Sequence, residues 1–234
     1  MHKHHWWQGS IESGELQEDV TGVVEPQQSR SLKSFERILE STVELIYEEG
    51  LEGCTVQNVL ARSDVGASSF YGKFESRDVL LEYLASLFWS SAAKDWAMIL
   101  DERRWRSCGA TTVIAQVMSM LVGWFRVEGP LLNAFLIHAL SEERGRRLSR
   151  ISEFDNGLAD MLAALLMQKS QEPQNEAPSV AVRVATLQAV ATVRSRLLFL
   201  GKGGEDGISD KSLAEEMSKG FLGHVEANGK VVHG

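Results

Sequence analysis

Residues 55–78 read TVQNVLARSDVGASSFYGKFESRD, and no other stretch of the chain carries as much structural information. Thr55 is a good N-cap for a short amphipathic segment, which the residues Asp64-Val65-Gly66 then break. A second short segment, ASSFYGKF over 67–74, follows at once, and Ser76 caps a long apolar run. Two short helices joined by a tight turn make a helix-turn-helix motif.

The stretch before this motif predicts a longer helix from residue 34 that stops at Gly50. Its apolar residues recur at spacings of three and four and form one stripe: Phe35, Ile38, Leu39, Thr42, Leu45 and Ile46. Glutamates at 36, 40, 44 and 48 fall on the opposite face, which we interpret as solvated. Residues 1–30 show no apolar periodicity, so we expect a mobile extension there, and its histidines (His2, His4, His5) are typical of a tag-like tail.

The rest of the chain also reads as helices, and no stretch alternates as a strand would. The predicted helices cover 77–103, 110–127, 130–141, 144–169, 179–200 and about 210–226, with Gly129-Pro130, a linker at 169–179 and a loop at 201–207 between them. We therefore predict an all-α fold. Its expected parts are an extension (1–30), a helix-turn-helix domain (31–83, motif 55–74), a second helical domain (84–228) and a tail (229–234).

The motif predicts how its side chains divide between the two faces of its last helix. Val65 should plug the turn, and Phe70 and Phe74, four apart, should share the inner face. The set expected to point outward is Ser68, Ser69, Gly72 and Lys73. Small side chains let a helix sit close to a DNA groove, and hydroxyls and a lysine can meet phosphates or base edges.

The segment Arg37–Leu81, RILESTVELIYEEGLEGCTVQNVLARSDVGASSFYGKFESRDVLL, resembles the tetracycline-repressor (TetR) family of bacterial transcription regulators. The segment has the family's order of elements. A first helix ends at a glycine, a second helix begins at a threonine cap, and a recognition segment and a long helix follow. The resemblance implies that Thr55 touches a DNA phosphate, that Tyr71 contacts the DNA backbone, and that Arg77 clamps a phosphate. Further expected DNA contacts are Ser68, Ser69, Lys73, Lys33 and Arg37.

Charge and three departures from the family pattern bear on DNA binding. The formal net charge of −8 argues mildly against a nucleic-acid partner, yet positions 55, 68, 69, 71, 73 and 77 carry no acid. Asp64 stands where the family usually has Gly or Ala, Gly66 replaces the usual Ser or Thr cap, and Ala67 replaces a common Lys or Arg. Fewer phosphate contacts predict weaker binding with a flatter salt dependence.

The resemblance also implies a C-terminal domain that binds a small effector and dimerises through its last two helices, about 179–200 and 210–226. Residues 180–193 are apolar around most of the helix circumference, so this helix should be buried on two sides, either by a partner or inside a monomeric bundle. Candidate walls of an effector pocket are Trp89, Trp96, Met118, Trp124, Phe125, Phe135, His138 and Met161. Core packing is the alternative for each of these residues.

The expected partners are a double-stranded DNA operator, a small apolar or aromatic effector and a second copy of the chain. We expect no cofactor, metal or membrane, because no phosphate-binding loop, metal-ligand spacing or full-length apolar span occurs. Cys54 and Cys108 predict two reduced thiols in a cytoplasmic protein. The family's commoner role is repression. Alternatives are a ligand-binding protein of the same fold without specific DNA binding and a helical enzyme with dispersed catalytic residues.

Overall fold

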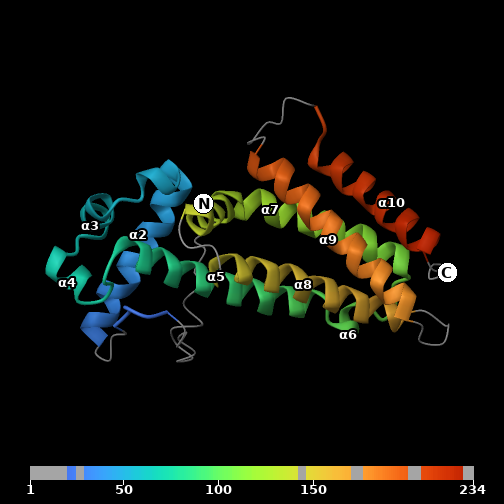
Figure 1. The fold of residues 1–234 in the computed structure, drawn as a ribbon, viewed down its shortest axis with the longest axis horizontal. Coiled ribbons are helices and arrows are strands. Elements are labelled where there is room, and N and C mark those ends of the chain that lie inside the picture. The colour runs from blue at the N-terminus through green and yellow to red at the C-terminus, as the bar shows by residue number, and fades with distance from the viewer. Residues whose placement is uncertain (1–19, 25–28, 142–145, 170–175, 200–206, 229–234) are drawn as a thin grey trace. The chain divides into compact units, whose positions relative to one another are not determined.

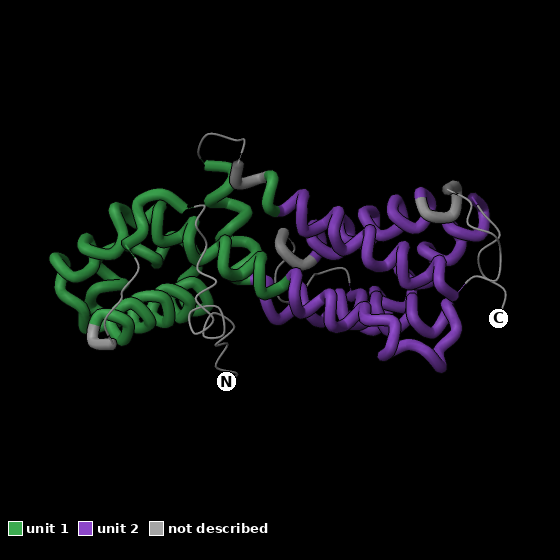
Figure 2. Tube along the Cα trace, turned by 90° about the horizontal axis from the view of Figure 1, so that it is seen from below, with its two compact units in different colours: residues 1–92, 130–150 green, residues 93–129, 151–234 purple. Residues whose placement is uncertain are grey.

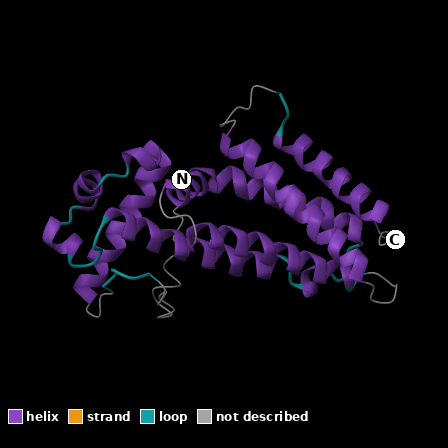
Figure 3. Ribbon diagram, in the orientation of Figure 1, coloured by secondary structure: helices purple, strands orange, loops and turns teal. Residues whose placement is uncertain are grey.

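The computed structural model describes residues 20–24, 29–141, 146–169, 176–199 and 207–228. The helices are α2 (Ser29–Gly53), α3 (Val56–Ser63), α4 (Ala67–Tyr71), α5 (Arg77–Ile99), α6 (Glu102–Trp105), α7 (Ala110–Ser141), α8 (Arg146–Met167), α9 (Glu176–Phe199) and α10 (Asp210–Asn228) (Figure 1). Helices and loops make up the described residues (Figure 3), apart from one isolated bridge between Val23 and Phe74. The all-α prediction is confirmed. The tail at 229–234 and most of the predicted loop at 201–207 lie outside the described residues.

The chain divides into two compact units (Figure 2). Unit 1 comprises residues 1–92 and 130–150, and unit 2 comprises residues 93–129 and 151–234. The chain therefore passes from one unit to the other three times, inside α5, inside α7 and inside α8 (Arg146–Met167). The functional boundary predicted near residue 84 stays a prediction.

Helix α2 supplies one side of the core of unit 1. All six residues of its predicted apolar stripe are buried. Gly50 interrupts the helix with a φ of 74°, which favours glycine, and a short helical turn continues to Gly53. The helix begins at Ser29, five residues before the predicted start, and residues 20–24 are also placed. The expected mobile extension over 1–30 is thus wrong for these residues, while 1–19 and 25–28 lie outside the described residues.

Two other predicted boundaries are wrong. The stretch predicted as one helix over 77–103 is split, because Asp101 caps a new helix by accepting a 2.8 Å hydrogen bond from the Arg103 N–H. The segments 110–127 and 130–141 are joined in α7, with Pro130 inside the helix. Phe125 and Leu131, on either side of the proline, are fully buried, so packing offsets the hydrogen bond that proline cannot make.

The predicted linker at 169–179 also ends earlier than expected. Helix α9 begins at Glu176, which places Pro178 in its first turn. A proline is tolerated there because the first N–H groups of a helix have no partner inside it.

Of the described helices, α7 is the one long and apolar enough to cross a membrane by length and composition. Core helices of soluble proteins pass the same test. Its residues Val113, Ile114, Val117 and Leu121 are buried inside the protein, and 39% of the apolar window is buried in all.

Candidate DNA-binding surface

Helix α3 begins at the predicted cap. The Thr55 Oγ1 accepts a hydrogen bond of 3.2 Å from the Asn58 N–H, and the Asn58 amide donates in turn to the Gly53 carbonyl at 2.8 Å. Thr55 remains exposed. The start of α3 is therefore fixed by its own side chains and is open to solvent.

The turn between α3 and α4 depends on two residues. Asp64 adopts a left-handed conformation (φ 50°, ψ 45°), which short polar residues tolerate, and its N–H donates to the Leu60 carbonyl. Val65 is buried, which confirms that it plugs the turn. The Asp64 carboxylate is fully exposed and lies 3.9 Å from the Arg37 guanidinium.

The aromatic residues of α4 and the residues after it anchor this short helix. Phe70 and Phe74 are fully buried, as predicted. The Phe74 ring stacks on Phe35 of α2 at 5.0 Å between centroids, and it lies 6.0 Å from Tyr83 of α5. Five residues are too few for a helix that is stable alone, so these contacts hold α4 in place.

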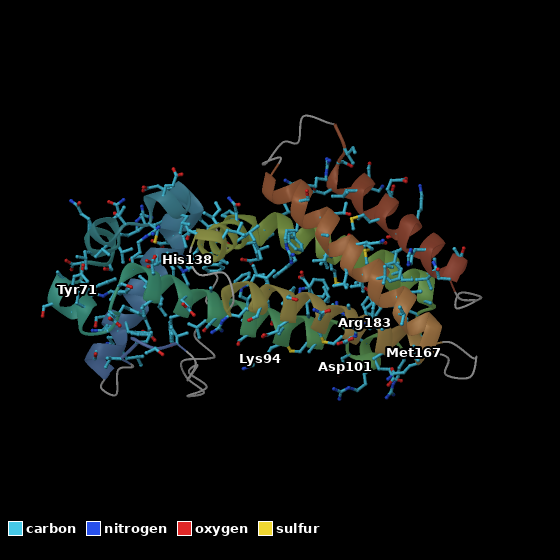
Figure 4. The ribbon with its side chains drawn as sticks, in the orientation of Figure 1. Tyr71, Lys94, Asp101, His138, Met167 and Arg183 are labelled. Atoms are coloured by element: carbon cyan, nitrogen blue, oxygen red, sulfur yellow. The ribbon has the colours of Figure 1, made fainter. Side chains whose placement is uncertain are left out.

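Tyr71 lies on the opposite face from this anchor. Its side chain is 57% exposed and projects away from the ribbon at the end of α4 (Figure 4). Ala67, Ser68 and Gly72 are also exposed, and Ser69 is half-buried. The outer face of α4 therefore carries one large side chain among small ones.

Lys73 does not point outward as predicted. It is only 7% exposed, and its Nζ donates to the Ser69 Oγ at 2.9 Å and to the Ser69 carbonyl at 3.2 Å. Burial lowers the pKa of Lys73 from its usual value. The side chain folds back because it finds two acceptors one helical turn earlier, which spacing alone does not reveal.

Arg77 ties the start of α5 to the junction of α2 and α3. Its Nη2 donates to the Leu51 carbonyl at 2.7 Å and its Nε donates to the Cys54 carbonyl at 2.5 Å. These two carbonyls lie at and just after the end of α2, where carbonyls lack helical partners. A phosphate contact of Arg77 stays a prediction.

Basic side chains on α2 and α3 have acidic neighbours. Lys33 and Arg37 are exposed on α2. Arg62 of α3 pairs with Glu48 at 2.6 Å, and Glu44 and Glu49 each lie 3.9 Å from its guanidinium. The hydrogen bond to Glu48 raises the pKa of Arg62 and lowers that of Glu48. The local charge is therefore partly neutralised.

Sequence reasoning missed one feature next to α4. The Val24 N–H donates to the Lys73 carbonyl at 2.8 Å, and the Glu75 N–H donates to the Gly22 carbonyl at 3.0 Å. Residues 20–24 thus pair with the segment directly after α4. Val20 is buried as well. Gly22, in the sequence TGVV at residues 21–24, could have indicated this pairing, because an isolated glycine often marks a place where two backbones approach closely.

Residues 38–84 match a family described as bacterial regulatory proteins, tetR family. They run from α2 through α3 and α4 into α5, so the match covers the helices described above.

Residues 38–84 form a TetR-family DNA-binding domain.

A solved structure supports the fold beyond the matched residues. It is the transcriptional regulator FadR from Bacillus subtilis, crystallised in complex with stearoyl-CoA. Its TM-score is 0.56 at 16% sequence identity, and the match covers 85% of this chain and 100% of that chain. At this identity the likeness shows the fold alone. No curated protein matches the chain in sequence.

The match of residues 38–84 to this family supports several predictions at a coarse level. The family consists of DNA-binding transcription regulators and not of enzymes, and its members act inside the cell. The predicted contact residues stay predictions. Among the described residues no cluster of His, Cys, Asp or Glu could hold a metal ion, and His2, His4 and His5 lie outside them.

The eight predicted effector residues fall into the two units. Trp96, Met118, Trp124, Phe125 and Met161 belong to unit 2, and Trp89, Phe135 and His138 belong to unit 1. All are buried except Trp124 and Met161, which are half-buried.

An aromatic cluster in unit 2 joins three helices. Trp124 of α7 meets Trp96 of α5 edge-on at 6.1 Å and stacks on Phe154 of α8 at 5.4 Å. Phe125 lies beside Trp124 at 5.1 Å, and the Arg194 guanidinium of α9 lies 5.9 Å from the Phe125 ring. Three of the eight candidate wall residues, Trp96, Trp124 and Phe125, thus lie in one cluster, and an effector pocket there stays a prediction.

His138 has a different environment from that cluster. It is buried on α7 (Figure 4). Its Nδ1 lies 3.9 Å from an Asp78 carboxylate oxygen at the start of α5. Phe135, one turn earlier, packs on Phe88 of α5 at 5.5 Å. Within unit 1 these contacts pack the end of α7 against α5, and they account for the burial of His138 without an effector.

Proposed function

We propose that this cytoplasmic protein is a homodimeric repressor that binds a palindromic DNA operator through α4 and is released by a lipophilic effector. The observation that carries the DNA part is the outer face of α4. It presents exposed Tyr71 among Ala67, Ser68 and Gly72. A helix with small side chains can approach base edges closely, and a phenol can hydrogen-bond to them or to phosphates.

The proposed contact residues differ in how they act. Thr55, Ser68, Tyr71, Lys33 and Arg37 are exposed and available to DNA directly.

Lys73 and Arg77 would act partly through neighbours. The Lys73 ammonium donates to the Ser69 Oγ, so the Ser69 hydroxyl keeps its own proton for a DNA acceptor. Arg77 uses Nε and Nη2 for backbone carbonyls and retains Nη1, which lies 3.8 Å from Asp78, for a phosphate.

Selection from a random pool of DNA duplexes by the purified full-length protein tests the DNA function. We expect an enriched palindrome with half-sites about one helical turn, roughly 34–36 Å, apart. We also expect a weak salt dependence, because few uncompensated cations line α4. A pool that remains random at low salt would overturn the proposal.

Exposed apolar residues on α9 support the dimer. Val180 and Val184 lie four residues apart on one helical face and are both exposed. Helix α10 packs on α9, as a two-fold arrangement of the last two helices requires.

Sedimentation should give a dimer at micromolar protein, and Val184→Asp should shift it to a monomer. Met98→Asp changes another exposed apolar residue on α5 and should leave the dimer intact. A wild-type monomer would contradict the proposal.

The aromatic cluster of unit 2 supports a lipophilic effector. Trp96 is almost fully buried, and its Nε1 has no hydrogen-bond acceptor among the described residues. A buried indole N–H without an acceptor is costly, so a polar atom of a bound molecule would stabilise it. The FadR structure contains stearoyl-CoA, which makes this compound a reasoned first probe.

Titration with stearoyl-CoA, stearate and coenzyme A separates the parts of such a ligand. We expect quenching of tryptophan fluorescence and release of the selected duplex by the acylated compound. Helix α5 runs from Arg77 in unit 1 to Ile99 in unit 2, so it can carry the effect along one continuous helix. A compound that binds and leaves duplex affinity unchanged would count against this coupling.

A further inference from the structure

Residues 20–24 form a short backbone strap beside the end of α4. Two hydrogen bonds hold it: the Val24 N–H donates to the Lys73 carbonyl, and the Glu75 N–H donates to the Gly22 carbonyl. The bridge pairs Val23 with Phe74 between them in antiparallel fashion. Figure 1 shows this segment in blue, before α2. The strap is thus attached to the residues that terminate the recognition helix.

The position of the strap matters because α4 is so short. Helix ends leave carbonyl groups without helical partners, and α4 has five residues in all. The residues after it, Lys73 to Glu75, carry both the buried Phe74 anchor and the two backbone groups that the strap satisfies. The strap therefore fixes the exit of α4 on the backbone side, while Phe74 fixes it on the core side.

Gly22 makes this close approach possible. Its φ is 90°, in the left-handed region that favours glycine. A Cβ at this position would lie 2.8 Å from the Glu75 Oε2, and 3.3 Å from both the Glu75 Cβ and the Val79 Cγ2. The exposed Glu75 carboxylate can swing away, but a larger residue would still be strained by the positive φ and crowded by the Glu75 Cβ and the Val79 Cγ2 at the start of α5.

Lys73 connects the strap to the exposed face of α4. Its carbonyl accepts from Val24, and its ammonium donates to Ser69 in the middle of the helix. Loosening the strap would therefore free Lys73, which holds Ser69. Ser69 directly precedes the Phe70 anchor and lies two residues before Tyr71.

We propose that the strap, residues 20–24, is part of the DNA-reading unit and holds the C-terminal end of α4 in the orientation that specific operator recognition requires. This inference rests on the proposed DNA function. The strap residues act as positioning residues: they hold α4 and need not touch DNA.

Val24 offers a matched pair of variants in the full-length chain. Its side chain is 64% exposed, so Val24→Ala removes little packing and keeps the N–H. Val24→Pro removes the N–H that donates to Lys73. Gly22→Ala strains the backbone at the other hydrogen bond of the strap, in which the Gly22 carbonyl accepts from the Glu75 N–H, and it removes no donor.

The first measurement is hydrogen exchange on the free protein. We expect faster exchange over residues 72–76 in Val24→Pro and Gly22→Ala, and unchanged exchange in Val24→Ala. Unchanged exchange in both strap variants would overturn the pairing itself. Thermal unfolding serves as the folding control, and Gly22→Ala carries the test if Val24→Pro does not fold.

The second measurement is affinity for the duplex that the wild type selects, compared with a scrambled duplex of the same length. We expect Val24→Pro to bind the selected duplex with about tenfold lower affinity, equal to about 1.4 kcal/mol. Its affinity for the scrambled duplex should equal that of the wild type. Three outcomes would overturn the proposal. Val24→Pro could lose the same affinity on both duplexes, Val24→Ala could lose as much as Val24→Pro, or both strap variants could bind with wild-type affinity. A wild type that selects no duplex would instead refute the DNA function.

Discussion

Phe70 and Tyr71 are neighbours in the chain with opposite surroundings. Phe70 is fully buried and meets Phe74 at 5.9 Å, whereas more than half of Tyr71 is exposed. The Tyr71 ring also lies edge-on against Phe70 at 5.3 Å, so its orientation is partly set by the core. One residue stabilises the domain and the other is available for recognition.

Substitutions at these two positions should therefore separate folding from DNA binding. Tyr71→Ala should change the free energy of unfolding by less than about 1 kcal/mol and weaken binding to the selected duplex. Phe70→Ala should cost about 3–5 kcal/mol in stability. Tyr71→Phe isolates the hydroxyl. Urea unfolding and duplex titration measure both effects, and strong destabilisation by Tyr71→Ala would contradict this division of roles.

The two cysteines should differ in reactivity. Cys54 is fully buried, and burial raises the pKa of its thiol to about 11, although the nearby Arg77 acts in the opposite direction. Cys108 is half-buried. Alkylation of the native protein at pH 8, read by mass spectrometry, should modify Cys108 first and spare Cys54 until urea unfolds the chain.

The same raised pKa predicts a pH dependence of stability. The unfolded thiol ionises first, at about pH 8.5, so the native state binds more protons above that pH. The contribution of Cys54 is therefore complete below about pH 8.5 and is lost as the pH rises toward 11. Cys54→Ser should flatten the decline in unfolding free energy over this window. An identical decline in the variant would contradict this assignment.

At the scale of elements, short helices here depend on their neighbours and long helices tolerate breakers. Helix α4 needs the Phe70 and Phe74 anchors, whereas the 32 residues of α7 include Pro130. Proline lacks the N–H that would donate to the Arg126 carbonyl four residues earlier.

Replacing Pro130 should therefore stabilise α7. Pro130→Ala restores that donor and should raise the free energy of unfolding by about 1–3 kcal/mol. Gly129→Ala is the matched control, because a Cβ there meets nothing within 4 Å and should add only about 1 kcal/mol through helix propensity. Urea titrations compare the two. If Pro130→Ala were less stable than the wild type, the prediction would be wrong and the proline itself would stabilise the fold at this position.

At the scale of the whole molecule, ion pairs between helices hold unit 2 together. Arg194 of α9 makes two hydrogen bonds to the Asp155 carboxylate of α8, and these side chains are only 18% and 15% exposed. Arg183 and Asp160 pair the same two helices at a more exposed site. Arg126 of α7 joins Asp210 of α10.

The two pairs between α8 and α9 form a natural comparison. Asp155→Asn should cost about 2–3 kcal/mol, because it leaves a largely buried guanidinium without its counter-charge. Asp160→Asn should cost less than about 1 kcal/mol, since water screens the exposed pair. Denaturant unfolding of the two variants measures the difference, and equal effects would contradict the role of burial.

The local pattern of the sequence predicted the DNA-binding helices well. Thr55 as a cap, Val65 in the turn and the buried pair Phe70 and Phe74 follow from capping chemistry and from helical spacing. These features depend on residues within a few positions of each other. The match of residues 38–84 to the TetR family has the same origin, because local anchors in register define that motif.

Other boundaries and contacts depend on partners that are distant in sequence. Spacing could not reveal that Lys73 turns back to Ser69, that Arg77 holds the carbonyls of Leu51 and Cys54, or that α7 continues through Pro130. Nor does it show that His138 meets Asp78 in unit 1 while Trp96 and Trp124 meet in unit 2.

By itself the sequence determined the all-helical class, the helix-turn-helix motif and the division of α4 into a buried and an exposed face, because these are set by propensities and periodicity over a few turns. Only the tertiary structure decided the pairing of residues 20–24 with 73–75. Those residues lie about fifty positions apart and join through backbone hydrogen bonds, which are available to almost every residue type and so leave little trace in side-chain pattern.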